Sequence, residues 1–500
     1  MNPIYDIEAG HEPERYELFE QPRYQFRHTR RTFIQIVSTG ILITWTAKPG
    51  YAQRVESGEE APHGSRFHIG KDGRITAMTG KVEMGQGARA QITQAVAEEF
   101  HVPVDQVQLV MADTDLVPND GPSHGSRTTP STIPRVRGSA AAARDALILL
   151  ACKRWGVDPS GAHIENGVIT HTSGKKTTLA ELAASGEGIE GVFGTETSAS
   201  DRSSTEDWTV LGTAVLRPNA RNVATGAHRY PSDIKRPGML YGKILRPPAV
   251  GAKLVSVDIG AAKTLEGVSA VHDGDFVGCA APTRLQAAKA VDAIAKTAIW
   301  SDAPTSSSET LFAVLKEKSQ AASGRGRSRD RIEGDVDAAL SAAKTVLRAA
   351  YEIPYIQHAP MEPRAATAEW DEGRLTVWTD TQQPFGVRGD VARAFGLRED
   401  QVRIIAPDFG GGFGGKQDPE VAIEAARLAK EAGKPVAVHW TREEEFSWAY
   451  CRPAGLVEVA AGIADDGSIS AWDFTNYNSG GSGIDCPYTV PNKRIQFRPS

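Results

Sequence analysis

The stretch Asp408-Phe-Gly-Gly-Gly-Phe-Gly-Gly-Lys-Gln417 decides how the rest of the chain is interpreted. Its glycines surround one aromatic residue, Phe413. Each glycine costs roughly 0.5–1 kcal/mol of folding stability relative to alanine where ordinary backbone angles would serve. A dense run of glycines therefore indicates that the backbone must approach another group closely.

The flanks of this glycine loop (residues 410–416) have regular patterns. Residues 401–406 have the pattern of a strand, and residues 418–432 that of a helix with Asp418 as N-cap and Pro419 at its first position. A glycine loop between a strand and a helix start is a general anion-binding arrangement. The sequence therefore predicts a phosphorylated or oxyanionic ligand.

The loop alone leaves that ligand open. Gly410 to Lys416 fits the phosphate-loop spacing G-x-x-x-x-G-K, but Gln417 stands where that motif has the serine or threonine that holds magnesium. The dinucleotide-binding spacing G-x-G-x-x-G also fits the loop. That motif has an acidic residue about 20 positions further along the chain, whereas Glu443 is more distant than that. A nucleotide and another oxyanionic cofactor both remain candidates.

Composition narrows the class of protein. A chain of 500 residues should hold two or more domains, at ~100–200 residues per domain. Its net charge of −6 argues against a general nucleic-acid binder. The four cysteines are scattered and form no C-x-x-C, so the pattern encodes neither an iron–sulfur cluster nor a structural zinc site.

The N-terminal region has the pattern of an export signal. Arg30-Arg31 precedes an apolar run at residues 36–45. This run is too short to span a bilayer, which takes about 20 apolar residues. A cleavage site is predicted after Ala52. The pattern resembles a twin-arginine signal, which would carry the folded protein to the periplasm.

The remaining chain mixes strand-like and helix-like segments, with a polar loop at residues 120–132. Serine and arginine runs predict an exposed linker at residues 301–331. Strands are expected at 75–79, 107–111, 346–351, 375–379, 435–440, 469–474 and 493–497, and helices at 90–100, 139–154, 179–184, 284–296 and 387–395.

Four motifs in this order resemble the molybdopterin-binding large subunit of the xanthine dehydrogenase/aldehyde oxidase family. They are Met84-Gly-Gln-Gly87, Gln357-His358 with Glu362-Pro363, Thr381-Gln382, and the glycine loop. The early position of Met-Gly-Gln-Gly, ahead of a small middle region, is similar to the isoquinoline 1-oxidoreductase beta-subunit branch.

The resemblance implies an α+β fold. A molybdopterin-binding domain in two sequence-separated parts would enclose a small α/β hammerhead-type domain. The expected boundaries are a tail and signal at 1–52, the first molybdopterin-binding part at 53–205, the hammerhead-like domain at 206–300, a linker at 301–333 and the second part at 334–500.

The resemblance also implies roles for single residues. Gln382 would lie beside the metal as a hydrogen-bond donor, and Gln417 would occupy a position at which xanthine-type members have a substrate-contacting glutamate. No protein side chain would bind the metal, because the cofactor holds it. The expected cofactor-binding residues are Gln86, Gly87, Gly125, Ser126, Gly411, Gly412, Phe413 and Gly414.

The implied activity is that of a molybdenum hydroxylase, which oxidises an aldehyde or hydroxylates an N-heteroaromatic ring with water as the oxygen source. The cofactor would be molybdenum–molybdopterin in its cytosine dinucleotide form. Electrons would pass to a small subunit with two [2Fe-2S] clusters, and a cytochrome c is a candidate acceptor. The alternatives are a phosphate-loop nucleotide-binding protein and a catalytically inactive partner or assembly subunit.

The last alternative arises because the family's catalytic glutamate lies near the C-terminus of a longer chain. We expect that glutamate beyond residue 500. Residues 469–474 and 493–497 are strand-like and need partners, which a continuation or a companion chain would supply.

Overall fold

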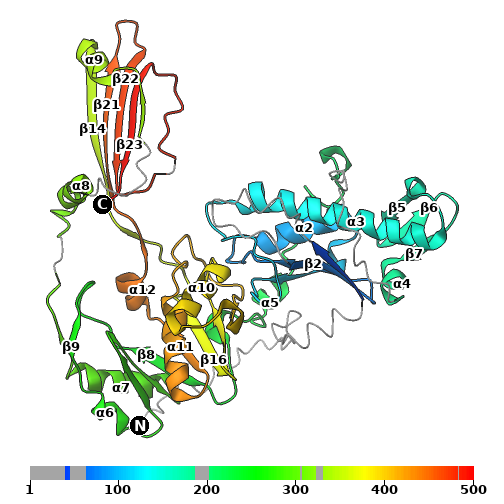
Figure 1. Cartoon of the computed structure of the whole chain (residues 1–500), viewed down its shortest axis with the longest axis horizontal. Coiled ribbons are helices and arrows are strands. Elements are labelled where there is room, and N and C mark those ends of the chain that lie inside the picture. Colours follow the sequence, from blue (N-terminus) through cyan, green and yellow to red (C-terminus); the bar gives the residue numbers. More distant parts are fainter. Residues whose placement is uncertain (1–39, 46–63, 186–201, 304–306, 322–329, 482) are drawn as a thin grey trace. The chain divides into compact units, whose positions relative to one another are not determined.

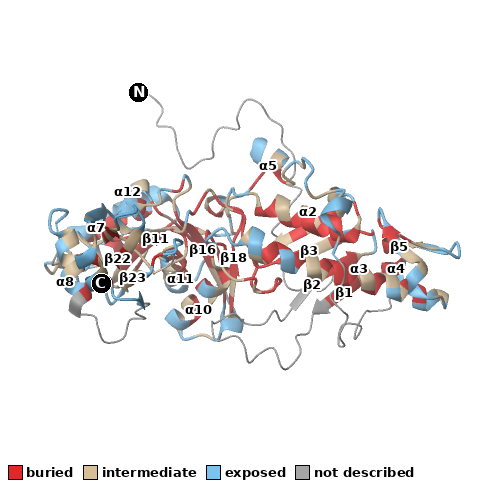
Figure 2. Cartoon of the chain, turned by 90° about the horizontal axis from the view of Figure 1, so that it is seen from above, coloured by how far each residue is buried: buried red, intermediate tan, exposed pale blue. Residues whose placement is uncertain are grey.

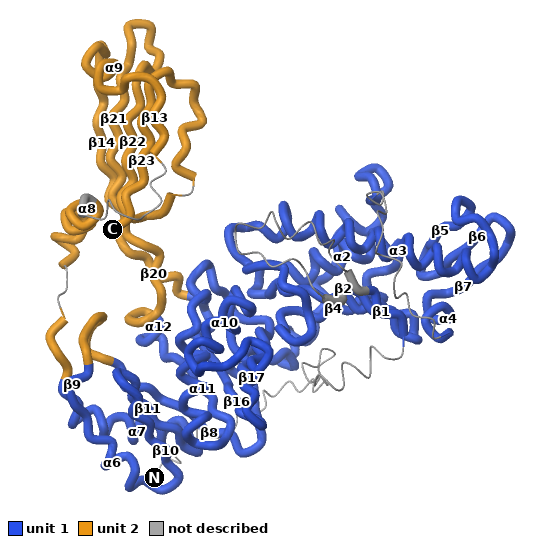
Figure 3. The backbone as a smooth tube through the Cα atoms, viewed as in Figure 1, with its two compact units in different colours: residues 1–246, 254–299, 360–445 blue, residues 247–253, 300–359, 446–500 orange. Residues whose placement is uncertain are grey.

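The computed structural model describes residues 40–45, 64–185, 202–303, 307–321, 330–481 and 483–500 (Figure 1). The chain forms two compact units (Figure 3). Unit 1 consists of Met1–Arg246, Leu254–Ile299 and Pro360–Glu445, and unit 2 of Pro247–Lys253, Trp300–Ala359 and Phe446–Ser500.

The N-terminal part of unit 1 contains a four-stranded sheet of order β1-β2-β3-β4. The first three strands are antiparallel neighbours, and β4 runs parallel to β3. The chain makes that parallel connection through helix α2, which packs on helix α3. The elements are β1 (Gly40–Trp45), β2 (Gly64–Gly70), β3 (Ile75–Thr79), α2 (Ala88–Phe100), β4 (Val107–Met111) and α3 (Ile133–Trp155).

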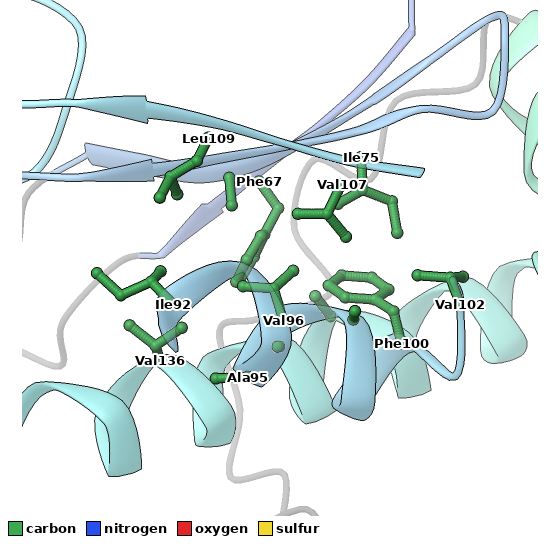
Figure 4. Close-up of a cluster of buried hydrophobic side chains, with 14 of the residues drawn as sticks. Phe67, Ile75, Ile92, Ala95, Val96, Phe100, Val102, Val107, Leu109 and Val136 are labelled. Atoms are coloured by element: carbon green, nitrogen blue, oxygen red, sulfur yellow. The ribbon is translucent and has the colours of Figure 1, made fainter. Parts of the chain in front are cut away.

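The core of this region lies between the sheet and α2 (Figure 4). The rings of Phe67 and Phe100 pack edge to face with centroids 5.3 Å apart. Ile75, Ile92 and Val96 are at most 1% exposed. Burying a side chain of this size contributes about 1.5–3 kcal/mol, which explains why apolar residues alternate along β3 and β4. Figure 2 shows the same burial on the inner faces of α2 and α3.

Strand β1 includes part of the apolar run that the sequence assigns to an export signal. Ile41 and Ile43 are 1% and 2% exposed, and both belong to the core beside β2. A cut after Ala52 would remove this strand. Arg30 and Arg31 lie outside the described residues.

A three-stranded sheet follows α3, with helix α4 at the range expected from the sequence. Its elements are β5 (Ala162–Glu165), β6 (Val168–His171), β7 (Lys176–Thr178) and α4 (Leu179–Ala184).

The second part of unit 1 contains a seven-stranded sheet of order β10-β11-β8-β19-β16-β17-β18. Helix α11 packs on β16 and β19, and α7 packs on β8 and β11. The elements are α5 (Ala220–Ala224), β8 (Leu240–Ile244), β9 (Leu254–Ser256), α6 (Gly260–Lys263), β10 (Ser269–Asp273), β11 (Phe276–Ala281), α7 (Arg284–Ala295), β12 (Ile299–Trp300), β16 (Ala365–Asp371), β17 (Arg374–Thr379), α10 (Pro384–Phe395), β18 (Val402–Ile405), α11 (Glu420–Ala432), β19 (Val436–His439) and α12 (Arg442–Trp448).

This sheet does not confirm a separate hammerhead domain at 206–300. Strand β8 pairs in parallel with β19, so the strands of that segment continue the sheet built by residues 365–439. The pairing places Leu240 beside Val436 and Gly242 beside Val438.

Hydrogen bonds join the four-stranded and the seven-stranded sheets of unit 1. The Thr114 N–H donates to the Ile404 carbonyl at 3.0 Å, and the Ile404 N–H donates to Thr114 Oγ1 at 2.9 Å. Ala406 and Phe409 donate to the carbonyls of Ala112 and Glu83 at 3.0 Å each. The glycine loop therefore begins directly beside the Met84-Gly-Gln-Gly87 segment.

Unit 2 is built on a five-stranded sheet of order β13-β23-β22-β21-β14. Helix α9 packs on it, and β15 pairs with β20. The elements are α8 (Leu311–Ala321), β13 (Arg331–Glu333), α9 (Val336–Ala342), β14 (Thr345–Ile353), β15 (Ile356–Gln357), β20 (Cys451–Arg452), β21 (Gly455–Ile463), β22 (Ile469–Tyr477) and β23 (Asn492–Arg498).

Two expectations for unit 2 are corrected. Strand β23 is not an open edge, because it lies between β22 and β13. The expected linker at 301–333 contains α8 and β13. Helix α8 forms because Leu315 is buried and Lys316 pairs with Glu458 of β21 at 2.8 Å. Among the described residues, no helix is long and apolar enough to cross a membrane.

Candidate functional site

The glycine loop is tightly packed against two side chains of its own unit. A Cβ added at Gly412 would lie 2.6 Å from Gln382 Oε1, and one at Gly410 would lie 2.7 Å from Glu362 Cβ. Gly411 and Gly414 have φ values of +90° and +100°, which favour glycine. The predicted close approach is confirmed, and these side chains are part of what the backbone approaches.

Gln382 joins three segments at this point. Its side chain is buried, its Oε1 accepts from the N–H groups of Gly414 (2.9 Å) and Lys416 (3.3 Å), and its Nε2 donates to the Ser123 carbonyl (2.9 Å). Its backbone also donates to the Lys416 carbonyl and accepts from the Ser123 N–H. One amide hydrogen on Nε2 remains beyond the bond to Ser123.

The Met84-Gly-Gln-Gly87 segment is organised by a residue that sequence reasoning missed. The buried carboxylate of Glu83 accepts from the N–H groups of Gly85 (2.8 Å), Gly87 (3.1 Å) and Arg89 (2.8 Å). An acid just ahead of a helix start stabilises the positive end of the helix, and that pattern was the available signal. Gln86 folds back on the same segment and donates to the Val82 carbonyl.

Two buried basic side chains hold the polar loop at residues 120–132 in place. Lys81 Nζ donates to the Pro122 carbonyl at 2.8 Å, and Arg66 pairs with Asp120 at 2.6 Å. Burial opposes ionisation of Asp120, but Arg66 and hydrogen bonds from Thr79 and the Gly80 backbone outweigh it and hold its pKa below the ordinary value. The anchor fixes the loop where Ser123 meets Gln382.

The same loop has a backbone suited to an anion. Gly125 and Ser126 have φ values of +58° and +56°, and Arg127 follows in the right-handed region. Successive left- and right-handed residues turn their N–H groups toward one concavity, a geometry that binds anions. A π-helix at Thr128–Thr132 begins immediately afterwards without a side-chain cap and leads into α3.

A cavity of about 530 Å³ lies between these segments. Helix α2 begins at its edge with Gly87 as N-cap, where the Glu83 carboxylate accepts from the N–H groups of Gly87 and Arg89, and the π-helix begins there without a side-chain cap, so two helix starts border the cavity. None of the described residues that line it is acidic. The lining residues are Met84, Gln86, Gly87, Ala88, Gln91, Ser123, His124, Gly125, Ser126, Arg127, Thr128, Thr129, Gln382, Phe413 and Gly414.

Most of the predicted cofactor-binding residues line this cavity, but three predicted site residues do not. Gly411 and Gly412 precede Phe413 in the glycine loop and are absent from the cavity lining. The Gln417 side chain, also absent from the lining, donates to the Gly414 carbonyl at 3.2 Å. The roles assigned to all these residues, including Gln382 and Gln417, remain predictions. Those that line the cavity are Gln86, Gly87, Gly125, Ser126, Gln382, Phe413 and Gly414.

Lys416 does not have the geometry of a phosphate-loop lysine. Its ammonium is fully buried, lies 2.5 Å from Asp380 Oδ2 and faces the ring of Phe409. Burial raises the pKa of Asp380 to about 7, with Lys416 opposing the shift. The expected helix after the loop begins later than predicted, at Glu420 with Pro419 as N-cap. The helix starts at the cavity are those of α2 and the π-helix instead.

Glu362 and His358 have local partners. Glu362 Oε2 accepts from the Gly410 N–H at 2.7 Å, and Oε1 accepts from Ser232 Oγ at 3.1 Å. Glu362 therefore holds the glycine loop. His358 belongs to unit 2, where its Nδ1 is 3.1 Å from the Tyr450 carbonyl.

Two buried arginines support the glycine loop, and the sequence analysis identified neither of them. Arg364 donates to Glu445 and to the Gly415 carbonyl. Arg89 pairs with Asp408 through two hydrogen bonds of 2.5 and 3.2 Å. No group of three His, Cys, Asp or Glu side chains that could hold a metal occurs in the described part of the chain.

Two models of the molybdopterin cofactor-binding domain match the chain, over residues 16–225 and 320–498. A nicotinate dehydrogenase subunit of Pseudomonas putida is 32% identical over 83% of this chain, which spans 35% of that protein. The beta subunit of isoquinoline 1-oxidoreductase from Brevundimonas diminuta is 26% identical over 79% of this chain, which spans 56% of that protein. The chain thus spans about a third to a half of these relatives.

A crystal structure of the Cu,Mo-CO dehydrogenase in its carbon monoxide reduced state resembles the fold with a TM-score of 0.51 at 21% identity. The match covers 58% of this chain and 44% of that one. The two domain matches confirm the predicted division into sequence-separated parts within a mixed helix-and-sheet fold. The chain belongs to the molybdopterin-binding large-subunit family of xanthine dehydrogenase-type proteins.

Proposed function

We propose that this chain is the cofactor-binding part of a molybdenum hydroxylase that oxidises an aldehyde or hydroxylates an N-heteroaromatic ring. The observation that carries the proposal is the cavity whose described lining contains no acidic side chain and which is bordered by the uncapped start of the π-helix and by the glycine loop. Its volume of about 530 Å³ lies in the 300–1,000 Å³ range of cofactor pockets. The names of the relatives support the same activity.

The residues present fit a pterin with an anionic tail. The backbone from Ser126 to Thr129 and the Arg127 side chain would hold phosphate, because the uncapped start of the π-helix and a neighbouring guanidinium favour negative charge. Gln382 would orient the cofactor through its remaining amide hydrogen. When bound, such a cofactor supplies two-electron redox chemistry at its molybdenum.

The described residues that line the cavity include no carboxylate that could act as a general base. Glu362, the acid of the recognised motifs, accepts hydrogen bonds from Gly410 and Ser232. The catalytic glutamate predicted beyond residue 500 therefore remains part of the proposal.

The cytosine dinucleotide form of the cofactor is also proposed. The start of the π-helix at Thr128 and the Arg127 guanidinium offer two groups that can each meet a phosphate. Acid hydrolysis of the loaded protein should release cytidine monophosphate in an amount equal to molybdenum. Guanosine monophosphate, or no nucleotide, would contradict this form.

We further propose a small partner subunit with two [2Fe-2S] clusters, and a cytochrome c as electron acceptor. Two relatives are named as subunits, which supports an assembly of several chains. Co-expression with the neighbouring genes should yield a complex that contains iron and molybdenum in fixed ratio. Purification of a molybdenum-loaded single chain with full activity would contradict the partner.

Export by the twin-arginine route remains a proposal based on Arg30-Arg31 and the apolar run behind them. Changing both arginines to lysine should leave folded protein in the cytoplasm. N-terminal sequencing of exported protein then decides whether residues 40–45 are removed or remain as β1.

The decisive test of the function is elemental and pterin analysis of protein from a host that makes the cofactor. We expect bound molybdenum and pterin together with negligible ATP binding, because Lys416 is buried against Asp380. Protein without molybdenum that binds ATP at micromolar concentration would favour the nucleotide-binding alternative.

A further inference from the structure

Phe413 combines an unusual backbone with an exposed ring at the edge of the cavity. Its φ is +54°, in the left-handed region that bulky residues rarely adopt. Its side chain is 70% exposed although it lies within a glycine-rich, largely buried loop. Strained residues of this kind persist where the surroundings fix them, and they cluster at ligand sites.

The surroundings fix the backbone that carries this ring. On one side, the Gly414 N–H donates to Gln382 Oε1 at 2.9 Å, and the Gly415 N–H donates to the Gly412 carbonyl at 2.8 Å. On the other side the ring lies over Gly411, where an added Cβ would be 3.0 Å from the Phe413 ring carbon Cε2. The backbone that carries Phe413 is therefore held in place by hydrogen bonds.

The side chains that line the cavity are neutral apart from two in the Ser123 loop. Met84 and Gln382 line the cavity together with Phe413, and Gln382 contacts the Ser123 loop. The ionisable side chains of the lining, His124 and Arg127, belong to the loop that we assign to phosphate. The neutral part of the lining thus offers an aromatic ring and a polarisable thioether to a ligand.

We propose that the Phe413 ring contacts the substrate and makes the enzyme prefer flat ring substrates over aliphatic ones that carry the same reacting group. The inference rests on the proposed function. Aromatic pairs favour offset-stacked or edge-to-face packing, and a methyl or ethyl group cannot replace that geometry. Phe413 is then a specificity-determining residue adjacent to Gln382.

The test uses the cofactor-loaded enzyme with its companion chains, and compares benzaldehyde with propanal. For Phe413→Leu we expect kcat/KM to fall about 2- to 13-fold for benzaldehyde, mainly through KM, and to stay within about twofold for propanal. Phe413→Gly removes the ring and suits the positive φ, so it should lose the same preference without losing thermal stability. Met361→Leu, at an 86% exposed position, is the matched control and should match wild type.

Calorimetric titration with quinoline gives a second measurement that needs no turnover. Wild type should bind, and Phe413→Leu should bind several-fold more weakly; equal affinities or no binding by wild type would overturn the inference. Equal losses for benzaldehyde and propanal would also overturn it, as would loss of molybdenum or pterin from the Phe413 variants. If loaded wild type oxidises neither aldehyde, the proposed activity fails separately, and the titration still decides the contact.

Discussion

At the scale of single residues, Gln382 makes more structural contacts than its motif suggested. Changing it to alanine would leave the part-buried Gly414 N–H and the buried Ser123 carbonyl without their partner. Each unsatisfied buried group costs about 1–3 kcal/mol. We therefore expect Gln382→Ala to lower the free energy of unfolding, measured by denaturant titration, and also to slow turnover of the loaded enzyme by about 10²–10³ if it orients the cofactor.

The matched control for this prediction is Gln383→Ala. Gln383 is half-buried, and the hydrogen bond described for its Nε2 goes to the Gln417 carbonyl. It should change stability by less than half as much. Wild-type stability in Gln382→Ala would show that the three segments do not depend on this side chain.

A second prediction at this scale concerns His439 in β19. Burial and the nearby Arg284 lower the pKa of His439 to about 3, whereas its ordinary value is 6.5. Below pH 6.5, His439 is protonated in the unfolded chain but stays neutral in the folded chain. Proton binding then favours the unfolded state, so the contribution of His439 to stability is present above pH 6.5 and is lost as the pH falls. Between pH 7 and pH 5 the loss should be on the order of 1–2 kcal/mol. Chemical denaturation at the two pH values should show a smaller difference in His439→Gln; an equal difference would contradict the prediction.

At the scale of elements, strand β1 is the clearest case for a test. Ile41 and Ile43 are buried against β2, and each contributes about 1.5–3 kcal/mol. Protein that begins at residue 53 should therefore unfold at a lower temperature than protein that begins at residue 38. Equal melting temperatures would show that the core does not need β1, and would favour removal of these residues with the signal.

The elements also show what could and could not be predicted from the sequence. Strands β3 and β4 lie at their predicted ranges, because alternation over a buried face is a local property. Helix α3 begins six residues before the predicted start, since the π-helix ahead of it is built from Thr, Pro and Ser, which carry no helical signal. The glycine loop was identified from its composition, but the supports Arg89 and Arg364 depend on long-range contacts that no local pattern encodes.

At the scale of the molecule, unit 1 depends on the junction between its four-stranded and seven-stranded sheets. No local pattern indicates this junction, because Asp113 and Arg403 lie 290 positions apart in the chain. Their side chains are mostly buried and hydrogen-bonded at 2.9 Å. Burial raises the pKa of Asp113 while Arg403 opposes the shift, so the carboxylate depends on that guanidinium to stay ionised.

Breaking this pair should therefore affect both stability and the site. Arg403→Ala would leave a buried charge without its partner, at a cost of about 3–5 kcal/mol. The Met84 segment and the glycine loop lie just beyond the junction, through the bond between the Phe409 N–H and the Glu83 carbonyl. We expect lower unfolding free energy and reduced pterin content in protein from a cofactor-competent host.

Arg398→Ala provides the control, because the Arg398–Asp400 pair is largely exposed and should change stability by less than about 1 kcal/mol. The double variant Arg403→Leu with Asp113→Leu removes both charges together, and it should recover much of the loss that either single change causes. Recovery of stability without recovery of pterin would show that the pair also sets the distance between the two loops. If Arg403→Ala keeps both its stability and its pterin, the backbone bonds from Thr114 to Phe409 are sufficient to hold the cavity closed.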